Sequence, residues 1–162
     1  MAAPELDVTH GTAGAEYFAA IRKLGLEPDA LFWAWDSTVE QMVLVLVTRQ
    51  FDRVGPLELS RRLFAAYNAT ATPKEISPFV IRLHSPQQAI IQQVAKLVSV
   101  NIRVTSVETG EIEKGFKLIV NGADMQFDPA WVYKFDTMSR RSPADLNRQW
   151  KRFDRNVAKL VA

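Results

Sequence analysis

Two neighbouring segments that are apolar on both faces constrain the fold of this chain more than any other feature. Residues 30–35 read ALFWAW and residues 42–47 read MVLVLV, so neither segment alternates between apolar and polar side chains. Strands of this kind are typical of the middle of a sheet whose two faces are both covered. We therefore expect a central pair of strands, at 30–35 and 39–49, with helices on both sides of the sheet.

Further helical and strand patterns surround this central pair. The apolar spacing predicts helices at 12–24, 56–67, 86–100 and 143–160, and strands at 78–83, 101–107, 112–120, 123–127 and 130–135. The path from the second central strand to residues 78–83 is long enough for a crossover, which indicates a parallel pair. Asn121-Gly122 predicts a tight hairpin between two of the later strands.

These elements predict a single α+β domain rather than two domains. The expected architecture is a mixed sheet of about five to seven strands with helices packed on it and a basic amphipathic C-terminal helix. Residues 1–11 are expected to form a flexible arm, residues 12–139 the α+β domain, and residues 140–162 the C-terminal helix. That helix is expected to dock on the same domain or at an oligomer interface. No repeat and no long linker interrupts the 162 residues.

Three helix starts share one local pattern. Gly55, Ser85 and Ser142 each precede a proline, and an acid or amide follows at the third helical position. Proline is favoured at the first helical position because the N–H that it lacks would be unpaired there, and the third side chain can reach back to the capping residue. We therefore expect helices to begin directly at Pro56, Pro86 and Pro143.

Composition excludes several classes of protein. The chain has no cysteine, which excludes disulfides, cysteine-ligated metals and a cysteine nucleophile, and its net charge is only +2. No glycine-rich phosphate loop and no paired histidines at metal-ligand spacing occur, so we predict neither a cofactor nor a metal. The acidic N-terminus lacks the pattern of a signal peptide, and no apolar run approaches the ~20 residues that cross a bilayer. We expect a cytoplasmic protein.

His84 is the first candidate for a catalytic group, and the carboxylates near the strand ends are the second. It leaves a predicted strand just before the Ser85-Pro86 helix start, where open α/β sheets often place their active sites. On the enzyme hypothesis, the protein is a small-molecule hydrolase or transferase that uses His84 together with Asp36 or Asp52. The alternative is that His84 is a polar strand end, and that the two aspartates serve turns.

The C-terminal helix carries the most distinctive pattern. Residues 1–133 contain 12 Lys or Arg and 15 Asp or Glu, whereas residues 134–162 contain 8 and 3. One face of the helix carries a heptad-like apolar stripe, formed by Leu146, Trp150, Phe153, Val157 and Leu160. A basic set lies in and before the helix, formed by Arg140, Arg141, Arg148, Lys151, Arg152 and Arg155.

Several functions fit this helix. The first hypothesis is a non-enzymatic interaction module whose apolar stripe binds a protein partner or a second copy of the chain, so that a chain ending at Ser139 would stay folded but lose assembly. The second is nucleic-acid binding by the basic set, with an affinity that falls steeply with salt. The stripe could instead dock on its own domain with its charges in solvent, and an anionic membrane surface is a further alternative. We expect no integral membrane association. At the level of the sequence these alternatives stay open.

Overall fold

The sheet is built around the two apolar segments. The computed structural model describes residues 5–96, 116–120 and 123–161. β1 (Ala30–Asp36) and β2 (Gln41–Val47) pair antiparallel in continuous register from Ala30–Val47 to Asp36–Gln41. The first five residues of β1 and the last five of β2 are buried, as expected for strands covered on both faces.

Within the described residues, the sheet has six strands in mixed orientation. Its order is β3-β2-β1-β5-β4, where β3 is Ile81–His84, β4 is Phe116–Val120 and β5 is Ala123–Phe127. β3 runs parallel to β2, and the other pairs are antiparallel. β6 (Val132–Phe135) pairs with the same edge of β1 as β5 does, but at the start of β1, whereas β5 pairs with its end. This confirms the predicted α+β domain, the mixed sheet, the parallel pair and the resumption of the last strand after a break.

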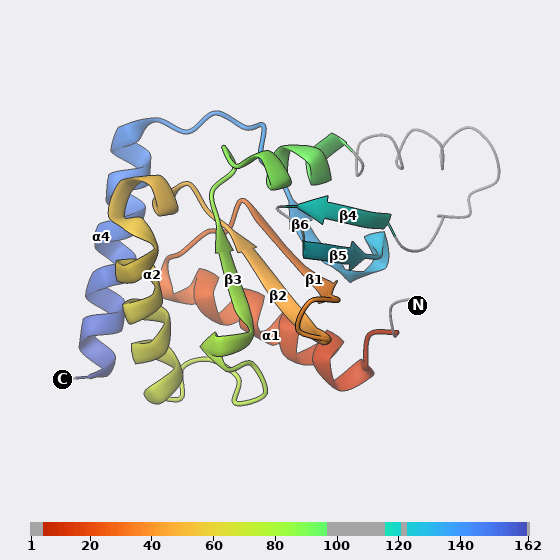
Figure 1. Ribbon diagram of the computed structural model, residues 1–162. Helices are drawn as coiled ribbons and strands as arrows, with labels where there is room; N and C mark the ends of the chain where they lie inside the picture. The colour runs from red at the N-terminus through yellow and green to blue at the C-terminus, as the bar shows by residue number, and fades with distance from the viewer. Residues whose placement is uncertain (1–4, 97–115, 121–122, 162) are drawn as a thin grey trace.

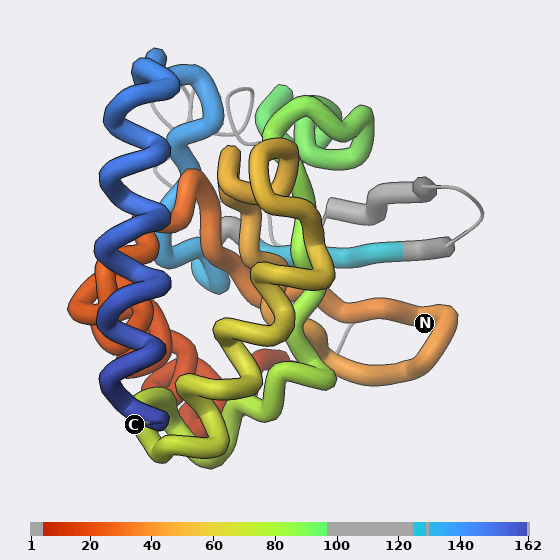
Figure 2. Tube along the Cα trace, turned by 90° about the vertical axis from the view of Figure 1, so that its left-hand side faces the viewer, coloured from red at the N-terminus to blue at the C-terminus, as the bar shows by residue number. Residues whose placement is uncertain are grey.

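Three helices cover one face of the sheet (Figures 1 and 2). They are α1 (Val8–Leu24), α2 (Gln50–Asn68) and α4 (Pro143–Leu160). Their buried side chains, which include Tyr17, Leu63 and Phe153, pack with Trp33 and Leu44 of the sheet in one apolar cluster. On the opposite face, Ile91 and Val94 from helical residues 89–96 pack against alternate residues of β1 and β2 and against Phe127.

Close packing at Gly14 joins α1 to the sheet. A Cβ atom at Gly14 would lie 2.1 Å from Tyr133 Oη and 2.7 Å from Trp33 Nε1. Trp33 donates a hydrogen bond to this Tyr133 hydroxyl over 2.9 Å, and the hydroxyl donates to Gly11 O over 2.6 Å. Glycine at position 14 therefore lets the helix backbone approach buried Trp33 and half-buried Tyr133 directly.

Several element boundaries differ from those expected from the sequence. α1 begins at Val8 and not at Thr12, because Asp7 caps it by accepting a hydrogen bond from Thr9 N. Residues 78–80 form a 3₁₀ turn, so the strand starts only at Ile81. The expected strand at 101–107, the start of the one at 112–120 and the end of the helix predicted at 86–100 lie outside the described residues.

Two of the three predicted proline helix starts are found, at Pro56 and Pro143. At Ser142 the side chain accepts a hydrogen bond from Asp145 N, and α4 begins at Pro143. Gly55 has a non-helical backbone, with φ 85° and ψ 158°, and this kink divides α2 into a short segment that begins at Gln50 and a longer one that begins at Pro56, as predicted. After Ser85 the chain makes a turn, and the helix begins only at residue 89.

Candidate functional site

The C-terminal helix α4 is part of the domain's own core. Phe153 and Val157 are fully or almost fully buried, and Trp150 packs against the same cluster, with its ring 5.6 Å from that of Phe153. Leu146 is half-buried, whereas Leu160 at the end of the stripe is 38% exposed. The structure thus gives the apolar stripe an intramolecular partner. Phe153 and Val157 are already covered within the chain, so the structure does not support their predicted role in binding a partner, which stays a prediction.

Polar contacts fix α4 between α1 and α2. Gln50 Nε2 at the start of α2 donates to Leu146 O over 2.7 Å, and Arg62 further along α2 pairs with Asp154. On the other side, Asn156 Nδ2 donates to Leu24 O, at the end of α1, over 2.7 Å. These contacts set the rotation of α4 about its own axis as well as its position.

The side of α4 that faces away from the core is strongly basic. Its exposed cations, which we call the outer basic face, are Arg148, Lys151, Arg152, Arg155 and Lys159. Arg148 pairs with the exposed carboxylate of Asp145, and the other four have no ion pair with any residue of the described ranges. Arg140, in the loop before the helix, is also exposed. Five of the six residues in the predicted basic set therefore point into solvent, and the sixth, Arg141, is half-buried.

Arg141 belongs to a groove beside α4. This open groove has a volume of about 480 Å³ and is lined by Arg22, Gly25, Glu27, Arg141, Arg148, Gln149 and Arg152. We call it the arginine groove. The sequence did not indicate Arg22, which lies on α1 more than 115 positions before Arg141 and reaches the groove only because α1 and α4 pack together.

Glu27 is partly neutralised at the edge of the groove. Arg22 Nε and Lys134 Nζ lie 2.9 and 2.7 Å from its two carboxylate oxygens. Partial burial opposes ionisation of Glu27, but hydrogen bonds from Lys134 and Arg22 outweigh it and lower the pKa of this carboxyl. Glu27 is therefore an ionised carboxylate whose charge is shared between Arg22 and Lys134.

A buried ion pair holds the loop that carries Arg140 and Arg141. The Arg49 guanidinium contacts the buried carboxylate of Asp29 and donates to the carbonyl oxygens of Thr137, over 3.2 Å, and Ser139. Arg49 N also donates to Asp29 over 2.7 Å. Burial raises the pKa of Asp29 in spite of Arg49 and of Arg141, which lies 4.0 Å from the carboxylate. One guanidinium thereby connects β1, the start of α2 and the loop before α4.

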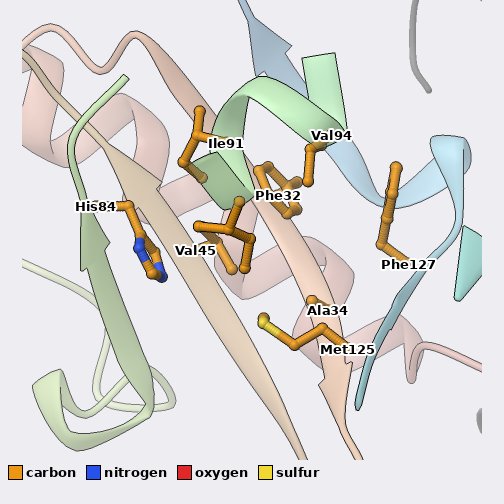
Figure 3. A pocket seen from close by; sticks show the side chains of 9 residues that line it. Phe32, Ala34, Val45, His84, Ile91, Val94, Met125 and Phe127 are labelled. Atoms are coloured by element: carbon orange, nitrogen blue, oxygen red, sulfur yellow. The ribbon is translucent and has the colours of Figure 1, made fainter. Parts of the chain in front are cut away.

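His84 lies against a small apolar cavity and not in a cleft (Figure 3). The cavity has a volume of about 10 Å³, room for about one water molecule, and its other lining residues are apolar. His84 Nδ1 lies 2.6 Å from Gln88 Oε1. Burial lowers the pKa of His84, Arg82 acts in the same direction, and the hydrogen bond with Gln88 opposes them.

The carboxylates proposed as partners of His84 have other roles. Asp36 pairs in register with Gln41 at the far end of β1, about 20 Å along the sheet from the level of His84. Asp36 accepts a hydrogen bond from Thr38 N in the β1–β2 turn. Asp52 accepts one from the hydroxyl of buried Ser85 rather than contacting the His84 ring. The predicted pairing of His84 with Asp36 is therefore wrong, and Asp52 lies nearby without forming a catalytic pair.

In the described ranges, no three or more histidine, aspartate or glutamate side chains are grouped so that they could hold a metal ion. Within the same ranges, no helix combines the length and apolar character that crossing a bilayer requires. No protein-family model, curated protein or solved structure matches this chain. The outer basic face and the arginine groove are thus the features from which a function can be argued.

Proposed function

We propose that the protein binds nucleic acid through the outer basic face of α4. The observation that carries this proposal is the orientation of the helix. Because Phe153 and Val157 pack into the core, the five cations on the opposite side are all held toward solvent. Clustering of Lys and Arg along one element is the electrostatic footprint expected of a nucleic-acid-binding surface.

The dimensions of the outer basic face suit a phosphate backbone. From Arg148 to Lys159 the helix rises about 16 Å, over which it presents five cations. A nucleic-acid strand carries one phosphate per 3.4 Å of duplex axis, so several phosphates can be contacted along this length. Contacts of this kind give affinity and orientation but carry no base sequence information. We therefore propose binding that is largely independent of sequence.

The interaction-module hypothesis receives less support from the same helix. Of its five stripe residues, Leu160 is the only one that is exposed, and it stands beside the exposed Val161 at the helix end. A patch of two side chains is far smaller than the ~800 Å² per partner of a standard interface. A protein partner or a homo-oligomer remains an alternative outcome of the test below.

The test is a salt titration of binding to a labelled oligonucleotide, measured by fluorescence anisotropy. The Lys151→Gln/Arg155→Gln variant removes two cations from the outer basic face without touching a contact to the core. The control, Lys74→Gln/Lys96→Gln, removes two exposed cations elsewhere. We expect the slope of log affinity against log salt to fall by about 2 in the first variant only.

Two results would overturn the proposal. One is the absence of binding at about 50 mM salt, where phosphate contacts are strong. The other is an equal effect of the two double variants, which would mean that net charge matters and the face does not. A dimer by light scattering, combined with no oligonucleotide binding, would favour the interaction module instead.

A further inference from the structure

We propose that the arginine groove holds one phosphate group of the bound nucleic acid, and that Arg152 is its central ligand. This inference rests on the proposed function and deepens it, because it separates a defined phosphate site from the general attraction of the outer basic face. Three parts of the chain contribute its arginines: α1 gives Arg22, the preceding loop gives Arg141, and α4 gives Arg148 and Arg152.

The groove is held in shape by contacts that do not involve its charges. Gly25 ends α1 at φ 114°, and its N–H bonds to Ile21 O and Arg22 O. A Cβ atom at Gly25 would lie 3.2 Å from Arg152 Cγ, so the stem of Arg152 lies directly on the glycine backbone. With Asn156 bound to Leu24 O, the two helices meet at a fixed position beneath the arginines.

Positive charge in the groove exceeds the carboxylates available to it. Glu27, which also lines the groove, is shared between Arg22 and Lys134. Arg141 is 4.0 Å from Asp29, whose carboxylate is already bound by Arg49. Two carboxylates thus face four cations.

The remaining two arginines add to this excess. Arg148 pairs with exposed Asp145, a contact that solvent weakens, and Arg152 has no ion pair within the described part of the chain. An anion entering the groove would reduce the mutual repulsion of these guanidinium groups.

A phosphate group fits this arrangement better than a carboxylate does. Its several oxygens can accept hydrogen bonds from several guanidinium groups at once, and the planar donor fork of arginine matches phosphate geometry. The Gln149 side chain on the same wall can add a neutral donor. Arg148 and Arg152 belong to both the groove and the outer basic face, so a strand that follows α4 passes the groove mouth.

The experiment uses pyrophosphate as a small probe and the full chain as the protein. Binding is measured by calorimetry, and the arginine Nε–H signals are followed by NMR. The Arg152→Gln variant removes the central ligand, whereas Arg155→Gln makes the same change one turn away on the outer basic face. We expect pyrophosphate affinity to fall at least tenfold in Arg152→Gln and to stay within twofold in Arg155→Gln. Both variants should weaken oligonucleotide binding, and Arg152→Gln should weaken it more, because Arg152 belongs to the groove as well as to the outer basic face.

The outcomes separate this inference from the proposed function. If oligonucleotide binds but pyrophosphate does not, or if both variants weaken pyrophosphate equally, the groove site is overturned and the proposed function stands. If pyrophosphate binds through Arg152 and oligonucleotide does not bind at all, the groove is a phosphate site and the proposed function is overturned. If neither probe binds, both are overturned.

Discussion

The two faces of the sheet are both apolar but are covered in different ways. On one face, α1, α2 and α4 bring side chains from three distant parts of the chain into one cluster, and polar contacts such as Gln50 to Leu146 O join the helices to one another. On the other face, the described cover consists of helical residues 89–96 and side chains around β5 and β6, with the ionisable ring of His84 at the edge of a small cavity. The outer basic face therefore belongs to α4, which lies on the sheet face where polar contacts join the covering helices to one another.

The largest expected effect tests whether α4 is a core element of the sheet face that it covers together with α1 and α2. Phe153→Ala removes a fully buried ring from the cluster and should lower the free energy of unfolding by about 3–5 kcal/mol. Leu160→Ala, in the same stripe but 38% exposed, is the matched control and should cost less than about 1 kcal/mol. Urea denaturation followed by circular dichroism measures both values. Similar losses for the two variants would mean that α4 is not a core element.

This result also bears on truncation. The sequence alone predicts that a chain ending at Ser139 stays folded. The structure favours the opposite outcome, because removal of α4 would expose buried side chains of α1 and α2 such as Ile21 and Leu63. Loss of assembly on truncation would therefore say little about a partner-binding stripe.

The second prediction concerns the buried ion pair between Arg49 and Asp29. Arg49→Met leaves the Asp29 carboxylate buried without its main partner and should cost about 3 kcal/mol. Adding Asp29→Asn to this variant removes the uncompensated charge and should recover part of that loss. Thermal and urea unfolding of the single and double variants test this. A double variant that is less stable than Arg49→Met would show that Asp29 does not need a cation there.

The smallest expected effect lies on the second face, where His84 should make stability depend on pH. Burial lowers the pKa of His84 below its usual value of 6.5, so the unfolded chain binds the proton more readily than the folded one. The contribution of His84 to the free energy of unfolding is complete above pH 6.5 and is lost as the pH falls through the pKa of His84 in the folded state. Free energies of unfolding measured from pH 5 to 8 should show this slope in the wild type, and His84→Leu should reduce it. An unchanged slope in the variant would assign it to another group.

Much of the fold follows from local sequence. The strands at 30–35 and 42–47 are evident because their apolar runs leave no polar face, and the ends of α4 are set by the Ser142-Pro143 cap and by its heptad-like spacing. Local rules fail where a distant residue changes the role of a local group. Ser85 carries the same capping pattern as Ser142, but its hydroxyl donates to Asp52, and the helix begins later.

The candidate site also has one part that the local sequence predicts and another that depends on distant residues. The basic set and its position on one side of a helix are visible in the sequence, because helical periodicity fixes which residues share a face. The arginine groove is not visible in the sequence, because it forms only where the packing of α1 against α4 brings Arg22 close to Arg152. Nor does the pattern of the apolar stripe say whether it covers its own domain or another molecule. That choice depends on whether α1, α2 and the sheet leave an apolar surface of matching shape.

The hydrogen bond from Asn156 to Leu24 O has a consequence for the rate at which the protein folds. It joins residues 132 positions apart, so nearly the whole chain must be brought together before it can form. Closing so long a loop costs entropy before any contact repays it, and chains with many distant contacts fold slowly. We expect α4 to dock late, after the strands and α1 have come together. Its contacts then act mainly on the lifetime of the folded state, since interactions absent from the folding transition state slow unfolding without accelerating folding.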